Sequence, residues 1–133
     1  NALQLGNVTA SYTLSGYTYP TAWNGSTFTI GTQPISGSLT ANFGAGTVGG
    51  SLSVPMGVNV YSASWSGNII GSSFAGYSPF GSVTSSGSDC SGCGCGASVA
   101  GFFAGANAAR AGLVYEIYGT DYGDIHGAAV FKR

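Results

Sequence analysis

Charged side chains are scarce in this sequence. Only 5 % of its 133 residues are charged, with three Lys or Arg, four Asp or Glu and a formal net charge of −1, whereas about 25 % is usual for a soluble domain. No run of Lys or Arg occurs anywhere, and a chain without a positive field does not attract phosphate backbones. We therefore expect no nucleic-acid partner.

Long apolar runs are also missing. No stretch approaches the roughly 18 consecutive apolar residues that a membrane helix needs, so we expect no transmembrane helix. The length is that of one domain and is sufficient to bury a single core. We therefore predict one domain over residues 1–133.

What the sequence does contain is glycine, aromatic residues and alternating small polar and apolar side chains. There are 24 Gly, and 13 % of residues are aromatic. Alternation with period two indicates half-buried strands. It predicts strands at Asn7–Ser15, Ser38–Phe43, Val48–Val54, Val58–Trp65, Ile69–Phe74, Ser98–Ala104, Leu113–Tyr118 and Ile125–Phe131.

Three stretches interrupt this pattern. Residues 16–35 are rich in Tyr, Gly and Pro and predict an irregular excursion with a short strand at Thr27–Ile30. Residues 82–96 are low-complexity Ser, Gly and Cys and predict a loop. Residues 105–111 hold the one helix-favouring cluster and predict a short helical turn. A further turn is predicted at Ser66-Gly67-Asn68.

Short strands with tight glycine turns and almost no helix leave two all-β architectures, a sandwich and a closed barrel. Closure removes exposed strand edges, and glycines inside strands, such as Gly71, Gly101 and Gly127, suit the bends of a small barrel. We predict an antiparallel up-and-down β-barrel of about eight strands.

The C-terminal half of the chain carries a family resemblance. Ala97–Tyr115 has a strand with a Gly-Phe-Phe signature, a short Ala-rich turn and a returning strand, and Ile125–Arg133 is a final strand with a Gly-Ala-Ala-Val-Phe ending. This arrangement resembles the transferrin-binding-protein B-like β-barrel family. The middle strands of that family are similar to Gly37–Phe43, Thr47–Val54 and Tyr61–Gly67, so the resemblance covers Gly37–Arg133. It implies an eight-stranded barrel at the bacterial surface, where relatives hold host proteins, haem carriers or unknown ligands.

The three cysteines are spaced Cys90-x-x-Cys93-x-Cys95 in the Gly/Ser-rich loop. Three interpretations compete: a metal site, which lacks a fourth nearby ligand; a redox pair, which lacks a following helix; and a structural disulfide, the default for an exported protein. We favour Cys90–Cys95, with Cys90–Cys93 as second choice. The third thiol then bonds to another chain or is buried and inert.

Other candidate chemistry is weak. Gly44–Gly49 matches a dinucleotide-binding fingerprint in letters, but a strand follows where the phosphate-binding helix should begin. The single histidine, His126, lies in a predicted strand without a serine elbow elsewhere. Glu116, Asp121 and Asp124 are interpreted as strand and turn residues. We therefore assign no catalytic residue, no metal site and no cofactor.

The aromatic residues exceed the needs of one small core, and some of them should face outward. Tyr and Trp dominate the energetics of protein interfaces. The interface candidates are Tyr17, Tyr19, Trp23, Trp65, Tyr77 and Tyr122.

Two functions of different class follow for a non-enzymatic protein outside the cell or on the bacterial outer surface. One is assembly through contacts with copies of itself, as in a fibre or coat, or with another surface protein, since low charge favours association. The other is a monomeric module that binds a haem carrier, host protein or glycan. A thiol redox protein is a third interpretation.

Overall fold

The structure is a computed structural model that describes residues 9–86, 94–120 and 122–133. The described segments form antiparallel strands with one 3₁₀ turn, η1. The strands are β1 Thr9–Tyr17, β2 Thr21–Trp23, β3 Phe28–Ile30, β4 Ser36–Asn42, β5 Thr47–Met56, β6 Asn59–Ile70, β7 Ser73–Ser85, β8 Cys95–Ala104, β9 Arg110–Thr120 and β10 Gly123–Lys132, with η1 at Ala106–Ala108.

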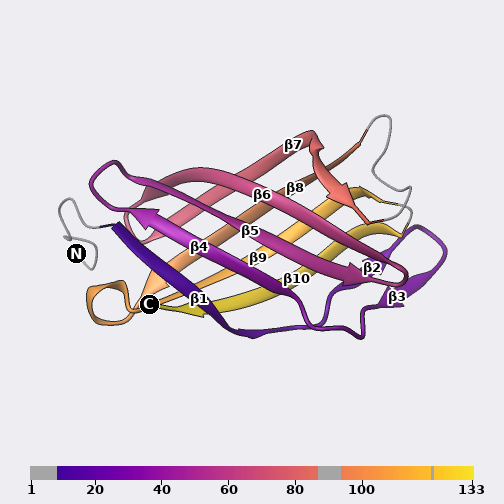
Figure 1. The fold of residues 1–133 in the computed structure, drawn as a ribbon, viewed down its shortest axis with the longest axis horizontal. Helices are drawn as coiled ribbons and strands as arrows, with labels where there is room; N and C mark the ends of the chain where they lie inside the picture. Colours follow the sequence, from indigo (N-terminus) through magenta and orange to yellow (C-terminus); the bar gives the residue numbers. More distant parts are fainter. Residues whose placement is uncertain (1–8, 87–93, 121) are drawn as a thin grey trace.

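Eight of these strands close into a barrel. Hydrogen-bonded neighbours follow the order β1-β4-β5-β6-β7-β8-β9-β10, and β10 pairs back to β1. The barrel is elongated, and its strands run obliquely around it (Figure 1). The predicted eight-stranded antiparallel barrel is therefore confirmed. Within the described residues no helix is long and apolar enough to span a membrane.

The excursion predicted at residues 16–35 is more regular than expected. Past the end of β1, β2 continues along the same edge of β10, with Trp23 opposite Asp124, and β3 folds back on β2. The side-chain oxygen of Asn24 accepts hydrogen bonds from the backbone N–H groups of Ser26 and Thr27 and holds the turn. The predicted short strand is thus found as β3, whereas β2 was missed.

The hairpin predicted at Ser66-Gly67-Asn68 is wrong. β6 continues to Ile70, and the chain turns at Gly71, whose φ of 64° is in the region that favours glycine. Inside β6, the missing side chain of Gly67 lets the backbone of β7 approach at Ala75. Gly67 thus permits close strand packing and Gly71 permits a turn, and the alternation pattern alone does not distinguish these two roles.

The other two irregular segments have narrower bounds than predicted. The short helical turn predicted at 105–111 is confirmed as the three-residue η1, and β9 already begins at Arg110. β7 extends to Ser85 and β8 starts at Cys95, so strand enters both ends of the loop predicted at 82–96.

The core fills the inside of the barrel with aromatic and aliphatic side chains. Phe103 lies at the centre of a ring cluster, with centroids 5.0 Å from Phe74, 5.2 Å from Phe43 and 5.8 Å from Tyr12. Trp65 stacks on Phe74 at 5.9 Å. Every barrel strand contributes inward side chains to the hydrophobic core. Because these side chains fill the interior, the candidate functional groups are those on the outer wall.

Candidate functional site

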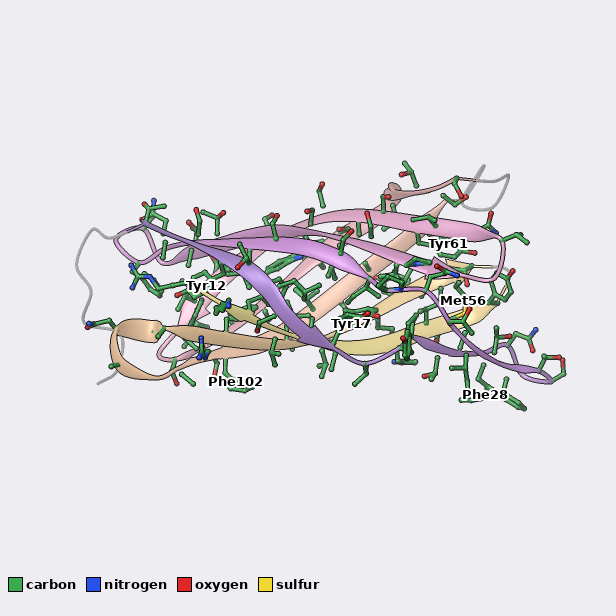
Figure 2. The ribbon with its side chains drawn as sticks, turned by 60° about the horizontal axis from the view of Figure 1, so that its bottom comes forward. Tyr12, Tyr17, Phe28, Met56, Tyr61 and Phe102 are labelled. Carbon is green, nitrogen blue, oxygen red and sulfur yellow. The ribbon has the colours of Figure 1, made fainter. Side chains whose placement is uncertain are left out.

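One part of the outer wall, over β8, β9 and β10, is apolar. Because successive side chains of a strand point to opposite faces, the inward phase of Leu113 leaves Val114 outward. Phe102 is 55 % exposed, Val114 58 % and Val130 49 %. Figure 2 shows Phe102 projecting away from the barrel while Tyr12 lies inside it. We define the apolar face as Ala100, Phe102, Gly112, Val114, Ala128 and Val130.

The apolar face is hollowed at its middle. A shallow depression of about 460 Å³ is lined by this face together with Ser73, Gly101, Leu113 and Ala129. Small residues make the hollow possible: the Phe102 ring lies over Gly112, where an added Cβ would meet it at 3.1 Å. A barrel wall is convex around its circumference, so this hollow is a local departure that can receive a side chain from outside.

The opposite part of the outer wall is polar and uncharged. Its outward side chains pair across strands, for example Ser11 with Thr40 and Ser38 with Ser51, and the two hydroxyls of the second pair lie 3.1 Å apart. We define the hydroxyl face as Thr9, Ser11, Thr13, Ser15, Ser36, Ser38, Thr40, Asn42, Thr47, Ser51, Ser53, Ser62, Ser64, Ser66 and Asn68.

Charged residues sit at the two ends of the apolar face. At one end Arg110 on β9 pairs in register with Lys132 on β10, and both are exposed. At the other end Glu116 pairs with His126, and Asp124 follows on the same face of β10. We call these two groups the basic end and the acidic end.

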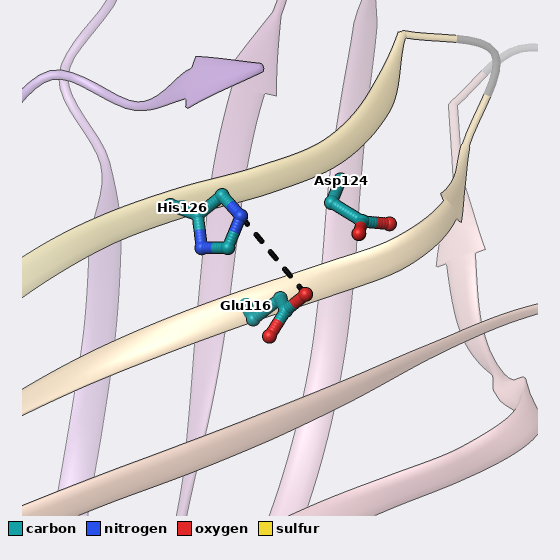
Figure 3. A group of neighbouring side chains, drawn as sticks. All are labelled: Glu116, Asp124 and His126. Carbon is teal, nitrogen blue, oxygen red and sulfur yellow. Dashed lines mark ion pairs between the residues drawn. The ribbon is translucent and has the colours of Figure 1, made fainter. Parts of the chain in front are cut away.

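The acidic end brings together groups that the sequence analysis left as separate strand and turn residues. The His126 Nε2 and Glu116 Oε2 atoms are 3.9 Å apart (Figure 3), and the ligand atoms of Glu116, Asp124 and His126 all lie within 4.8 Å of one another. One imidazole and two carboxylates form a donor set that suits Zn²⁺ or Mn²⁺. All three are partly or fully exposed, and exposed groups of this kind commonly stand without an ion. We assign no metal site; Asp121 lies outside the described residues.

Aromatic side chains extend the outer wall beside the acidic end. Trp23 lies opposite both Asp124 and Phe28 across the strands and is 54 % exposed. The Tyr17 and Tyr19 rings meet edge to face at 5.8 Å. A groove of about 730 Å³ runs between Tyr19, Val114, Glu116 and His126. The predicted interface candidates Tyr17, Tyr19 and Trp23 are thus exposed and lie on one side of the molecule.

The remaining interface candidates separate. Tyr77 is exposed on β7. Trp65 is only 4 % exposed and stacks in the core, so its assignment as an interface residue is wrong. Trp65 follows Tyr61 and Ala63 at alternate positions of β6, and this spacing could have predicted that its side chain points inward. Tyr122 is half-buried against the core, and its hydroxyl lies 3.4 Å from the Val58 backbone nitrogen.

The cysteines are only partly described. Cys95 is buried at the start of β8 and is disulfide-bonded. Cys90 and Cys93 lie outside the described residues, so the pairing stays a prediction.

Two buried tyrosines have altered protonation behaviour. Burial raises the pKa of Tyr115, and burial also raises the pKa of Tyr12, partly opposed by the positive charge of Arg133. The Tyr12 hydroxyl donates to the Ala108 carbonyl at 2.7 Å, whereas the Tyr115 hydroxyl has no hydrogen-bond partner. Both hydroxyls lie in the interior and serve the core rather than the outer wall.

The fold has close counterparts among solved structures. A mutant of the vaccine antigen transferrin binding protein B from Haemophilus parasuis Hp5 matches with a TM-score of 0.60 and 18 % identity, covering 95 % of this chain and 26 % of that one. The isotype 1 protein of the same name from serogroup B Neisseria meningitidis matches with a TM-score of 0.57 and 15 % identity, covering 96 % and 26 %. The chain shares their barrel fold.

A third structure extends this likeness to another binding protein. The N-lobe domain of lactoferrin binding protein B from Moraxella bovis matches with a TM-score of 0.54 and 14 % identity, covering 93 % of this chain and 59 % of that domain. The chain spans about a quarter of the transferrin binding protein B chains. At these identities the likeness is one of fold. No family model and no curated protein sequence matches the chain.

Measured against this transferrin-binding-protein B-like fold, the sequence resemblance was correct for the architecture. The sequence analysis missed Arg110, Phe102, Val114 and Val130 as surface features. Alternation could have found them, because a strand whose inward residues are Leu113, Tyr115 and Ile117 must turn Val114 outward.

Proposed function

We propose that this chain is a non-catalytic β-barrel module that makes protein–protein contacts through its apolar face, on the bacterial cell surface or outside the cell. The observation that carries the proposal is the half-exposed set of Phe102, Val114 and Val130 around a hollow. Contiguous exposed apolar patches with polar rims mark interaction sites. The hydroxyl face on the other side of the barrel presents Ser, Thr and Asn side chains instead.

The neighbours in fold support the same class of function. Their names record binding of transferrin and of lactoferrin, so this barrel fold occurs elsewhere within proteins that bind other proteins. The surface location is proposed on the same ground. Because fold alone does not imply function, the proposal rests first on the composition of the outer wall.

A second candidate function is capture of a small ligand in the groove between Tyr19 and His126. The groove combines an aromatic ring with hydroxyl, imidazole and carboxylate groups, which suits a glycan. Replacement of Tyr19 by Ala would then abolish glycan binding without changing contacts made through Val114. The apolar face is the stronger candidate because burying its exposed apolar side chains releases water from apolar surface.

Site-specific photo-crosslinking tests the proposed function. A photo-reactive residue is placed at Val114 on the apolar face and, as a matched control, at Thr40 on the hydroxyl face, both in cells that produce the protein. We expect a light-dependent adduct with a protein from position 114 and none from position 40. Absence of an adduct at 114, or equal yields at the two positions, would contradict the proposal.

A further inference from the structure

We propose that the apolar face is the interface of a symmetric dimer, in which a second copy of this chain packs in antiparallel orientation. The basic end of each copy then lies against the acidic end of the other. This inference rests on the proposed function and names the partner. The arrangement of charges, the position of the hollow and the requirements of symmetry carry it.

The basic side chains are gathered at one place on the surface. The chain has three basic side chains, and all of them lie within one end of β9 and β10 or the adjoining C-terminus. Arg133 donates to the Asn107 carbonyl at 2.7 Å. Arg110 and Lys132 are exposed, and the only ion pair among the described residues is the one between His126 and Glu116. The basic end is therefore uncompensated within the described part of the chain.

The acidic end is its counterpart. Glu116 and Asp124 are the two acidic side chains of the described residues, and both face outward on the same strand pair as the basic end. In a chain with only 5 % charged residues, the opposite signs are separated along one face. Complementary potentials of this kind orient an encounter and determine its register.

The two charged ends are symmetric about a point in the middle of the apolar face. Arg110 and Glu116 are six residues apart on β9, about 20 Å at the rise of a strand, and their β10 partners are Lys132 and His126. The midpoint of this rectangle falls at Leu113 and Ala129. A two-fold axis through that point exchanges the two ends, so each acidic group meets a basic group at both edges of the contact.

The apolar hollow lies at this midpoint. Its lining includes Gly112, Val114, Ala128 and Val130, which surround Leu113 and Ala129. Two convex barrels would otherwise touch along a line. The hollow accepts an apolar side chain of the other copy, and the half-exposed Phe102 at its edge is the largest available.

These features favour a second copy over an unrelated protein. An unrelated partner needs opposite charges at the same separation with an apolar contact between them. A second copy supplies both by symmetry, because an isologous interface uses one patch twice.

Charge reversal at each end tests the dimer by sedimentation equilibrium. Wild-type protein is expected to dimerise, and more weakly at high salt. Glu116→Lys with Asp124→Lys leaves both ends basic, and Arg110→Glu with Lys132→Glu leaves both ends acidic. Juxtaposed like charges cost several kcal/mol, so the dissociation constant of each variant should rise at least about 100-fold.

Mixing the two variants provides the decisive measurement. One variant has two basic ends and the other two acidic ends, so an equimolar mixture should form a heterodimer with near wild-type affinity. The control Thr40→Lys with Ser51→Lys adds charge to the hydroxyl face on β4 and β5, away from β8 to β10, and should leave the dimer intact. If a charge-reversed variant fails to fold by circular dichroism, Phe102→Ser and Val130→Ser replace it, and each should weaken the dimer.

A wild-type monomer at every concentration would overturn the dimer, as would reversed variants that dimerise normally or mixtures that do not recover. A monomer whose position 114 crosslinks to a different protein would leave the proposed function standing and reject the second copy alone. An adduct of twice the chain's own mass supports both.

Discussion

The two sides of the barrel differ in their outward side chains and are alike in their inward side chains. On β4 and β5 most outward residues are Ser or Thr, whereas on β8 to β10 the outward residues are mostly apolar, with charged residues at the two ends of β9 and β10. Inward residues are hydrophobic in both regions. The fold therefore constrains the residues of the inner face, which must be hydrophobic, whereas the residues of the outer face can vary and can serve a function.

The hydroxyl face shows how a barrel with little charge stays hydrated. Each Ser, Thr or Asn offers donors and acceptors to water, and cross-strand pairs such as Ser38 and Ser51 also contact each other. The apolar face lacks such groups. Desolvation therefore costs little there and releases water from apolar surface, which makes it the better surface for contact.

The largest effect is expected when a carboxylate is placed, in each region, at an inward position and at the outward position next to it. Leu39→Asp and Leu113→Asp put an unpaired charge in the core and should cost about 3–5 kcal/mol or more, enough to unfold a marginally stable domain. Thr40→Asp and Val114→Asp point outward and should change stability by less than about 0.5 kcal/mol. Circular dichroism during urea unfolding measures all four. Unfolding of Val114→Asp would show that the apolar face belongs to the core.

A smaller test compares two buried tyrosines, one beneath each region. Tyr12→Phe removes a hydrogen bond to Ala108 and should destabilise the protein by about 1 kcal/mol. Tyr115→Phe removes a buried hydroxyl without a partner and should stabilise it by about 1 kcal/mol. Urea unfolding of both variants against wild type gives the two signs. Equal signs would contradict the different bonding of the two hydroxyls.

An effect of no more than similar size is expected, and only at alkaline pH. Burial raises the pKa of Tyr115 above the usual value of about 10, so the unfolded chain releases this proton first. Stability is then fully present below pH 10 and declines as the pH rises above it, by about 1 kcal/mol within the first pH unit. Unfolding curves across this range should show a shallower decline for Tyr115→Phe, and an identical decline would argue against the raised pKa.

Most of the architecture could be predicted from alternation. The stretch from Leu113 to Tyr118 and the stretch from Ser38 to Phe43 alternate clearly, and both are strands in the structure. The hairpin between β6 and β7 was misplaced because Gly67 was assigned to a turn and Gly71 to the interior of a strand, and the structure reverses the two roles. Only the approach of the Ala75 backbone shows which of them turns.

The candidate site was less predictable. Aromatic content alone selected Trp65, which the core uses, and it passed over Val114 and Val130, whose type is ordinary for a buried strand. Glu116, Asp124 and His126 were treated as separate residues because their proximity depends on the register of β9 against β10.

By itself, the sequence determined that the chain forms strands with one apolar side, since period-two alternation is a local property, and that its surface carries little charge. Only the tertiary structure decided the register in which each strand pairs with its neighbour and the closure of β10 onto β1. The register between β9 and β10 places the acidic residues at one end, the basic residues at the other and an apolar hollow between them. This register depends on how the side chains of both strands pack in the barrel, and alternation within one strand does not record it.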